Sequence, residues 1–315
     1  MVVWFYFRNF VAENHPNNGI MMIEQFLNYL KFERNYSAKT VDEYGNDLRA
    51  FQSYFKNMDA HLTWESVDSD VIRDWMESMM DKGNIATSIN RRLSALRSFF
   101  RFALSRHLVE SDPAHVITGP KKEKPLPQFL KDKEMERLLD ERMWNFDNFD
   151  DVRARTIISV FYETGIRVAE LVGLDDAAVD LDACRLRVTG KRDRQRVIPF
   201  GDGLCAELRR YMNLRAEKIL VDTAGVLFVT NKGARMQTYQ VTYIIKKHLS
   251  KVCTLKKRTP HVLRHTFATT MLNHGAELES VKKLLGHRSF STTEVYTHTT
   301  FDQLRKIYDT AHPRA

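Results

Sequence analysis

Six residues in the second half of the chain have side chains that can act on a phosphate group. In order along the sequence they are Arg167, Lys191, His261, Arg264, His287 and Tyr296. The planar fork of an arginine binds two phosphate oxygens at once and keeps its charge at physiological pH. Histidines donate hydrogen bonds and can transfer protons near neutral pH. A set of this kind predicts chemistry at a phosphodiester.

The tyrosine and the lysine supply the other functions that breaking a phosphodiester requires. A tyrosine oxygen can attack phosphorus and hold the phosphate covalently, so that the bond energy is kept for rejoining. A lysine at a turn can protonate the leaving sugar oxygen. Two arginines far apart in the sequence can hold the phosphate from two sides and stabilise the transition state. This inventory requires no metal, no ATP and no other cofactor.

The sequence around the first histidine predicts the helix that positions it. Thr259 followed by Pro260 is typical of a helix start, with the threonine as N-cap and the proline in the first helical position. His261, Arg264 and His265 then share one helical face. Because helix N-termini favour anions, a phosphate is expected to bind nearby.

Two further signals surround the last histidine and the tyrosine. Gly286 is expected to end a helix, which leaves His287 at the junction. Residues 291–294 form a capping box that predicts a new helix, with Tyr296 on its second turn.

A hairpin is expected to carry the lysine. The alternation in 185–188 and 196–199 predicts two strands, with Lys191 in or beside the turn that joins them. Residues 226–229 are a further strand candidate. The rest of this half, from 132–142 and 150–163 to the segment 237–308, is expected to be mainly helical.

Each of these residues has a plainer interpretation when it is taken alone. Arg167 and Glu170 have the spacing of a solvated helix pair, and Tyr296 alone is more often a buried aromatic. Lys191 belongs to a merely basic hairpin if nothing else is considered, because three arginines follow it: Arg192, Arg194 and Arg196. The occurrence of all six residues in order, each in its own context, favours the catalytic interpretation.

Zinc is the alternative for the histidine pair. His261 and His265 have the i, i+4 spacing of zinc ligands. The second position of that motif is Val262 rather than the glutamate that a metalloprotease needs. No metal site is therefore expected.

The first half of the chain is expected to be helical and to bind DNA. One predicted helix has an inward stripe that consists of Ile89, Leu93, Leu96, Phe100 and Ala103. Its other face presents Asn90, Arg91, Ser94, Arg97 and Arg101. A solvated face is the usual meaning of such a stripe, but beside a phosphate-handling domain a surface that faces a DNA groove is favoured.

The length and composition of the chain indicate two domains and a DNA partner. The 315 residues predict two domains, and the net charge of +8 favours phosphate backbones. The Pro-rich, basic segment 113–127 is expected to be a linker whose Lys121, Lys122 and Lys124 follow the DNA backbone. The three cysteines lack metal spacing and indicate a reducing, cytoplasmic environment, and no apolar run has membrane-spanning length.

The same motifs resemble those of the tyrosine recombinases, and within them the bacterial Xer recombinases. The resemblance covers nearly all of 22–315 and rests on the six residues with their contexts and on five further stretches: 32–37, 93–100, 170–174, 291–293 and 308–315. The last of these is more similar to the XerC branch than to the XerD branch. The resemblance implies a mainly α fold with a small β-sheet. It divides the chain into an extension (1–21), a helical, SAM-like core-binding domain (22–112), the linker and a mixed α/β catalytic domain (128–315).

The resemblance also implies a mechanism and partners. Tyr296 would form a 3′-phosphotyrosyl link, Lys191 would protonate the leaving 5′-oxygen, and His261 would assist proton transfer. Arg167, Arg264 and His287 would hold the phosphate. Four protomers, of this chain alone or with a XerD-like recombinase, would exchange strands of double-stranded DNA through a Holliday junction. A septal DNA translocase is a further expected partner, and the location implied is the cytoplasm, at the nucleoid.

Several alternatives remain open beside this interpretation. One is the integrase of a mobile genetic element, and another is a non-catalytic DNA-binding protein of the same fold.

Residues 1–21 are expected to be a dispensable tail that arises from an upstream start codon, with a small packing arm as the competing view. The apolar stripe Leu304, Ile307, Tyr308 and Ala311 predicts a terminal helix. Folding back on its own domain is the simpler arrangement for such a helix. In the resembling family it docks on a neighbouring protomer, so deletion after Thr300 is expected to leave a folded monomer that binds one site but assembles and recombines poorly.

Overall fold

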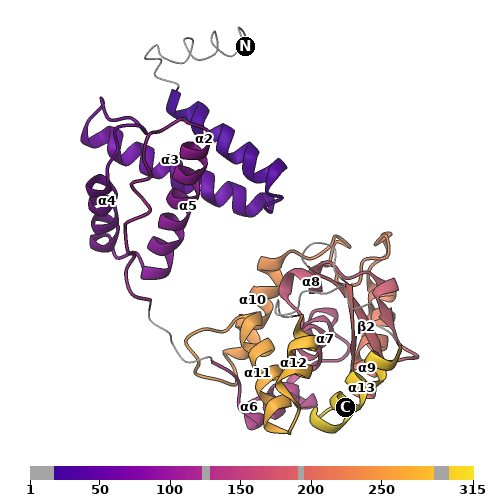
Figure 1. Ribbon diagram of the computed structural model, residues 1–315. Helices are drawn as coiled ribbons and strands as arrows, with labels where there is room; N and C mark the ends of the chain where they lie inside the picture. The colour runs from indigo at the N-terminus through magenta and orange to yellow at the C-terminus, as the bar shows by residue number, and fades with distance from the viewer. Residues whose placement is uncertain (1–17, 123–127, 191–194, 287–297) are drawn as a thin grey trace. The chain divides into compact units, whose positions relative to one another are not determined.

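The computed structural model describes residues 18–122, 128–190, 195–286 and 298–315 (Figure 1). The chain divides into two compact units, Met1–Pro125 and Leu126–Ala315. Both are mainly helical, and the second also holds a small three-stranded sheet, which confirms the expected fold class. No helix in the described ranges is long and apolar enough to cross a membrane.

The first unit packs its helices around an aromatic core. The helices are α2 (Asn18–Asn28), which continues into a π-helical turn (Tyr29–Glu33), α3 (Ala38–Met58), α4 (Ser69–Asp81) and α5 (Ala86–Ser105). Trp64 lies against Phe51, Phe55, Phe99 and Phe100, with ring centroids 4.4 to 5.8 Å apart. The inward stripe predicted for α5 is buried in this core, as expected.

Short polar side chains set where these helices begin. The Ser37 hydroxyl accepts a hydrogen bond from the backbone N–H of Thr40, and the Asp68 carboxylate accepts from Asp70 and Val71. Helix α2 begins at Asn18.

The second unit is organised around one buried helix. Its helices are α6 (Asp132–Leu139), α7 (Phe149–Thr164), α8 (Val168–Val172), α9 (Asp202–Lys218), α10 (Thr238–Leu249), α11 (Pro260–Asn273), α12 (Leu278–Leu285) and α13 (His298–Ala311), with 3₁₀ turns at Glu141–Met143 and Asp176–Ala178. Helix α7 is buried all round from Val152 to Thr164 and packs against α9 on one side and α11 on the other (Figure 1). A helix buried on every face has few ways to move, so its C-terminal end is a rigid base for the residues after it.

The sheet is a hairpin with one short added strand. Strands β1 (Val179–Asp180), β2 (Arg185–Thr189) and β3 (Gln195–Pro199) are antiparallel in the order β1-β2-β3. The predicted hairpin is confirmed, with Arg185 opposite Pro199 and Thr189 opposite Gln195.

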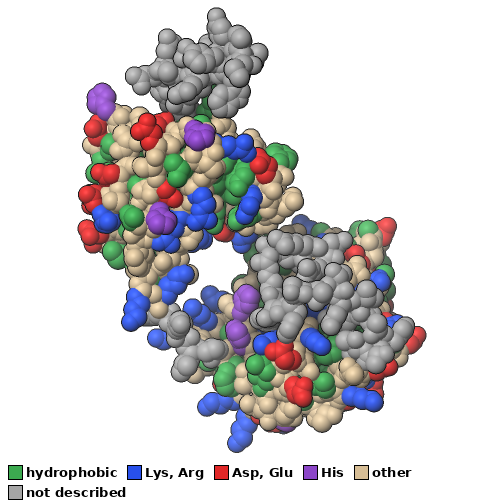
Figure 2. Space-filling model, in the orientation of Figure 1, with side chains coloured by type: hydrophobic (Ala, Val, Ile, Leu, Met, Phe, Trp, Pro, Cys, Tyr) green, Lys and Arg blue, Asp and Glu red, His purple; other side chains and the backbone are tan. Residues whose placement is uncertain are grey.

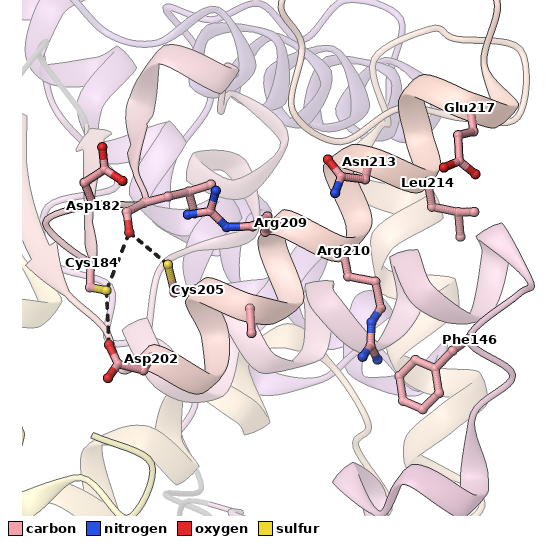
Figure 3. Close-up of a pocket in the computed structure, with 12 residues that line it drawn as sticks. Phe146, Asp182, Cys184, Asp202, Cys205, Arg209, Arg210, Asn213, Leu214 and Glu217 are labelled. Carbon is pink, nitrogen blue, oxygen red and sulfur yellow. Dashed lines mark hydrogen bonds between the residues drawn. The ribbon is translucent and has the colours of Figure 1, made fainter.

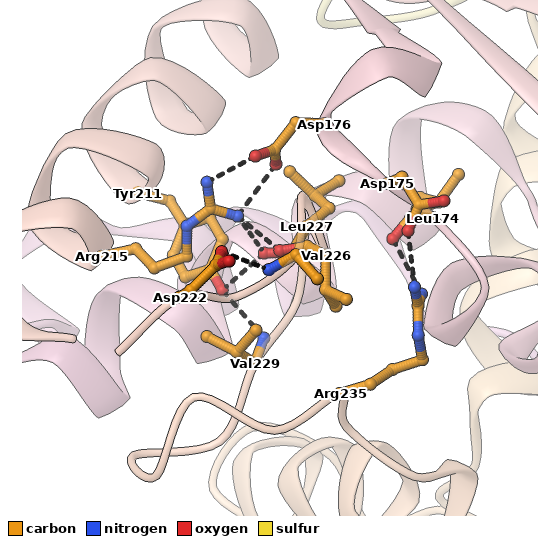
Figure 4. A network of polar contacts seen from close by, with 11 residues as sticks. Leu174, Asp175, Asp176, Tyr211, Arg215, Asp222, Val226, Leu227, Val229 and Arg235 are labelled. Atoms are coloured by element: carbon orange, nitrogen blue, oxygen red, sulfur yellow. Dashed lines mark hydrogen bonds and ion pairs between the residues drawn. The ribbon is translucent and has the colours of Figure 1, made fainter. Parts of the chain in front are cut away.

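The strand expected at 226–229 is not formed. These residues make only isolated bridges, from Val226 to Asp175 and from Val229 to Arg235. The Arg215 guanidinium donates to the carbonyls of Val226 and Leu227, and the Tyr211 hydroxyl also donates to Leu227 (Figure 4). Because side chains take the carbonyls that a strand ladder would use, the stretch stays irregular despite its apolar, β-branched sequence.

Helix α13 packs on the unit to which it belongs, which is the simpler of the two arrangements expected for its stripe. Leu304, Tyr308 and Ala311 are buried, and the helix lies against β3, α11 and α12. Beyond it, Arg314 forms ion pairs with Glu163 of α7 and Glu207 of α9. The end of the chain is therefore part of the core of the second unit.

We expect the burial of α13 to be measurable as stability. Leu304→Ala should lower the free energy of unfolding by about 2–5 kcal/mol, because a leucine side chain that is 3% exposed leaves a cavity. The matched control is Leu220→Ala, since Leu220 is 92% exposed in the same unit. Urea denaturation followed by circular dichroism measures both. Deletion after Thr300 should abolish cooperative unfolding of this unit, and an unchanged midpoint would contradict cis packing.

Candidate active site

The end of α7 delivers Arg167 to the surface. Helix α7 stops at Gly165, whose φ of +59° is left-handed. A Cβ at this position would lie 2.5 Å from Phe267 and 2.8 Å from Leu285, so only glycine lets the ends of α7, α11 and α12 approach so closely. Arg167 follows two residues later as the N-cap of α8.

Glu170 ties Arg167 in place. Its carboxylate accepts from the backbone N–H of Arg167 at 2.8 Å and from the Arg167 guanidinium at 2.9 Å. The Arg167 side chain is 40% exposed while that of Glu170 is buried. The Arg167 guanidinium is therefore fixed by the buried Glu170 carboxylate on one side and exposed to solvent on the other.

Helix α11 brings a buried arginine beneath two exposed histidines. The predicted helix start is confirmed, with Thr259 as N-cap and Pro260 in the first position, although the threonine side chain makes no capping hydrogen bond. His261 and His265 are exposed, and Arg264 is buried. The Arg264 guanidinium donates to the carbonyls of Gly165 and Leu285.

The charges in this cluster perturb one another. Burial, together with the nearby charges of Arg167 and Arg196, lowers the pKa of Arg264 to about 10, against the opposing effect of Glu170. Partial desolvation lowers the pKa of His261, and His265, Arg264 and Arg167 act in the same direction. Arg264 therefore stays charged at neutral pH, while the imidazole of His261 is neutral and can accept a proton.

The end of α12 is the point where the cluster converges. Gly286 ends this helix in a left-handed conformation with φ of +65°, as the sequence predicted. Its last three carbonyls accept from three arginines: Leu284 from Arg196, Leu285 from Arg264 and Gly286 from Arg167, at 2.9, 2.6 and 3.1 Å. Helix C-termini leave carbonyls unsatisfied and carry partial negative charge, so they attract guanidinium groups.

A buried ion pair lies under this junction, and the sequence did not reveal it. Arg196 of β3 donates to both carboxylate oxygens of Glu170, at 2.8 and 2.9 Å. The side chains are 7% and 4% exposed. The interpretation of Glu170 as half of a solvated pair is therefore wrong, as is that of Arg196 as a merely basic hairpin residue. One signal was present: Arg196 has the same strand phase as the buried Ile198, opposite Val188.

The other predicted catalytic residues lie outside the described residues. These are Lys191, His287 and Tyr296, together with the capping box at 291–294. Strand β2 ends at Thr189 and β3 begins at Gln195, which brackets the expected position of Lys191. Of the six, the structure thus brings together Arg167, His261 and Arg264, and the roles of all six stay predictions.

The predicted DNA-facing stripe of α5 is largely occupied by internal contacts. Asn90 donates to the carbonyls of Ala86 and Pro120, Arg97 donates to those of Ala114 and Ile117, and Arg91 pairs with the buried Asp47.

The remaining two side chains of the stripe, Ser94 and Arg101, are exposed, and the Ser94 hydroxyl donates to the Asn90 carbonyl. Of the predicted linker lysines, Lys121 and Lys122 are exposed, and Lys124 lies outside the described residues. Basic side chains are interspersed with neutral and apolar ones on the visible face of this unit (Figure 2). Part of the stripe therefore anchors 112–120 to α5.

A cavity in the second unit lies away from the arginines. It has a volume of about 800 Å³ and is lined by the outer face of α9, the turn before β2 and Phe146 (Figure 3). Cys184 and Cys205 share the Leu181 carbonyl as an acceptor there. No catalytic candidate contributes to its lining. In the described part of the chain, no group of three or more His, Cys, Asp or Glu side chains is arranged to hold a metal ion.

Comparison with known families decides the assignment. The model of the phage integrase family matches residues 128–303, and that of the phage integrase N-terminal SAM-like domain matches residues 23–107. The chain belongs to the phage integrase family. Among these tyrosine recombinases, XerC of Chlorobaculum tepidum is 38% identical over 92% of this chain and 94% of that protein. XerD of Staphylococcus aureus is 34% identical over 93% of this chain and 99% of that protein.

A solved recombinase structure agrees with the fold. The XerH site-specific recombinase, bound to a palindromic difH substrate after cleavage, has a TM-score of 0.73. It is 20% identical and covers 92% of this chain and 95% of that one. This similarity extends through both units and shows the fold.

Glu170 should give the recombinase a measurable pH dependence of stability. Burial raises its pKa, but the hydrogen bonds and charge of Arg196, with the N–H of Arg167, outweigh this effect and hold it at about 2, below the ordinary 4.5. The stabilisation is thus complete above pH 4.5 and is lost as the pH falls toward 2. Glu170→Gln should lower the free energy of unfolding by about 3–5 kcal/mol at pH 7 and flatten its dependence on pH between 4.5 and 2.

A carboxylate on the surface provides the control for this comparison. Glu279→Gln removes an exposed partner of Lys282 and should change the stability of the protein little at any pH. Urea unfolding at several pH values measures all three proteins. Equal pH slopes for wild type and Glu170→Gln would show that the buried pair does not control this titration.

Proposed function

We propose that the chain is a site-specific recombinase that resolves chromosome dimers at cell division in the manner of XerC. It would cut and rejoin DNA through a 3′-phosphotyrosyl intermediate and a Holliday junction. The observation that carries the proposal is the convergence of Arg167 and Arg264 at the end of α12, with His261 close enough to feel both charges. Similarity to XerC and XerD proteins over nearly the whole of both sequences supports it.

The proposed cleavage step gives each side chain a separate task. The Tyr296 oxygen forms a bond to phosphorus while the bond from phosphorus to the 5′-oxygen breaks. Neutral His261 accepts or relays the tyrosine proton, and Lys191 gives a proton to the leaving 5′-oxygen. Arg167, Arg264 and His287 hold the non-bridging oxygens, where negative charge grows in the transition state. Rejoining is the reverse sequence with a new 5′-hydroxyl, so no energy source is consumed.

The proposed partners are consistent with the two-unit organisation. Residues 22–112 would form the core-binding domain, 113–127 the linker and 128–315 the catalytic domain, and both domains would contact double-stranded DNA. Arg101 of the first domain and Lys121 of the linker are exposed, and they are better placed for phosphate contacts than Asn90 or Arg97, which bond internally. A tetramer with itself or with a XerD-like recombinase, acting at the nucleoid and regulated by a septal DNA translocase, completes the proposal.

Tyr296→Phe tests the nucleophile. The variant should bind a recombination site with nearly wild-type affinity, because the ring remains and only the attacking oxygen is lost. It should form no covalent complex with a nicked suicide substrate, which traps the wild type as a slowly migrating species on a denaturing gel. Tyr308→Phe is the control, since Tyr308 is fully buried in the core. Trapping by Tyr296→Phe would refute the assignment.

Arg264→Lys tests the arginine fork. A lysine offers a point charge and cannot reproduce the bidentate geometry. We therefore expect a loss of about 3 kcal/mol in transition-state stabilisation, more than a hundredfold in the rate of cleavage, with little change in DNA affinity. Arg153→Lys is the matched control, because Arg153 is also buried and donates to the carbonyl of Val229, remote from the site. Full activity of Arg264→Lys, measured by single-turnover cleavage, would contradict the proposed role.

A further inference from the structure

Arg196 lies on the buried side of the cluster formed by Arg167 and Arg264, and its own side chain does not reach the protein surface. Each of its three guanidinium nitrogens donates to a protein acceptor: two to the Glu170 carboxylate and one to the Leu284 carbonyl. Its side chain is 7% exposed. A guanidinium bonded in three directions has one orientation, and its burial leaves no open edge for a DNA phosphate. Any influence of Arg196 on the reaction must therefore pass through its neighbours.

One of these neighbours is the helix end itself. A Cβ on Gly286 would lie 3.2 Å from the nearest nitrogen of Arg196 and 3.3 Å from its central carbon. The backbone of Gly286 thus rests on the guanidinium, while the preceding turn bonds to it through Leu284. Arg196 therefore contacts the end of α12 at two points, the Leu284 carbonyl and the backbone of Gly286.

The same helix end sets the positions of two proposed catalytic arginines. Arg264 bonds to the Leu285 carbonyl and Arg167 to the Gly286 carbonyl, so a shift of the helix end displaces both groups. Arg196 also holds the carboxylate of Glu170, and that carboxylate binds the backbone and side chain of Arg167. Arg167 is therefore connected to Arg196 through both Glu170 and the end of α12, and Arg264 through the end of α12 alone.

We propose that Arg196 is a positioning residue for DNA cleavage, which holds Glu170 and the end of α12 so that Arg167 and Arg264 meet one phosphate together. The inference rests on the proposed function. It assigns Arg196 a role in rate rather than in DNA affinity. Because misplacement of a catalytic group by about 1 Å can cost about 100-fold in rate, Arg196→Met should slow single-turnover cleavage by about that factor.

Arg215 provides a matched control for the structural effect of losing a buried arginine. It also forms a bidentate ion pair, with Asp176 at 2.9 and 2.7 Å, and donates to two backbone carbonyls, those of Val226 and Leu227. It lies in the same unit but has no contact with the arginine cluster among its hydrogen bonds in the described structure (Figure 4). Arg215→Met and Arg196→Met should both lower stability, and only the second should slow cleavage.

A substrate without charge at the cleaved phosphate separates positioning from general destabilisation. A methylphosphonate replaces one non-bridging oxygen with a methyl group and so removes the charge that Arg167 and Arg264 neutralise. On this substrate the loss of cleavage rate caused by Arg196→Met, relative to wild type, should be smaller, and so should the loss caused by Arg167→Ala. A defect of the same size on both substrates would show a merely structural role and overturn the proposal.

Different results would contradict this proposal and the proposed function. If the wild type forms no covalent complex with the nicked substrate, the proposed function fails. If the wild type forms it and Arg196→Met forms it equally fast, the positioning role fails and the function stands. Arg196→Lys, which retains a buried positive charge beside Glu170, provides the test if the methionine variant does not fold. It should be folded by circular dichroism and still cleave slowly, and wild-type cleavage by this variant would refute the proposal.

Discussion

The catalytic unit depends on a balance between three guanidinium groups and the groups that bring them together. Arg167, Arg196 and Arg264 repel one another, and the pKa of Arg264, lowered to about 10 by burial and by the two other charges, reports that repulsion. Glu170 offsets it by pairing with two of the three arginines. The carbonyls at the end of α12 supply further negative potential without adding a titratable group. The three guanidinium groups are thereby held together by the protein alone, as the proposed binding of a phosphate requires.

The surrounding fold restrains the segments that carry these charges. Helix α7 is buried all round and ends at Gly165, where Phe267 and Leu285 leave no room for a side chain. Arg167 is two residues from that fixed point, and Arg264 bonds back to the Gly165 carbonyl. Helix α13 packs beside β3 and α12, so the end of the chain also supports the sheet from which Arg196 projects. Pre-organisation of this kind avoids reorganising charges during the reaction.

Local signals in the sequence predicted most of the elements but not the surfaces on which they pack. The helix start at Pro260, the helix end at Gly286 and the β2–β3 hairpin were predicted correctly, since caps, prolines and alternation act within a few residues. The strand expected at 226–229 was wrong. The burial of Glu170 was missed because its main partner, Arg196, is distant in the sequence and belongs to another element.

Long-range contacts also decided the other differences. The α5 stripe was predicted to face DNA, but the segment 112–120 returns and takes the hydrogen bonds of Asn90 and Arg97. The apolar stripe of α13 predicted burial correctly, yet a stripe cannot say which surface covers it. For the site, the residue types predicted phosphate chemistry. The sequence could not show that Arg167 and Arg264 come together by bonding to the end of α12.

The burial of the segment 226–229 also has a consequence at high protein concentration. Val-Leu-Phe-Val is the kind of short, uncharged, β-prone run that can pair with the same run of another chain. Here all four side chains are buried, and the carbonyls of Val226 and Leu227 are already bonded to Arg215 and Tyr211. Pairing of this run with another copy would therefore require the second unit to open first.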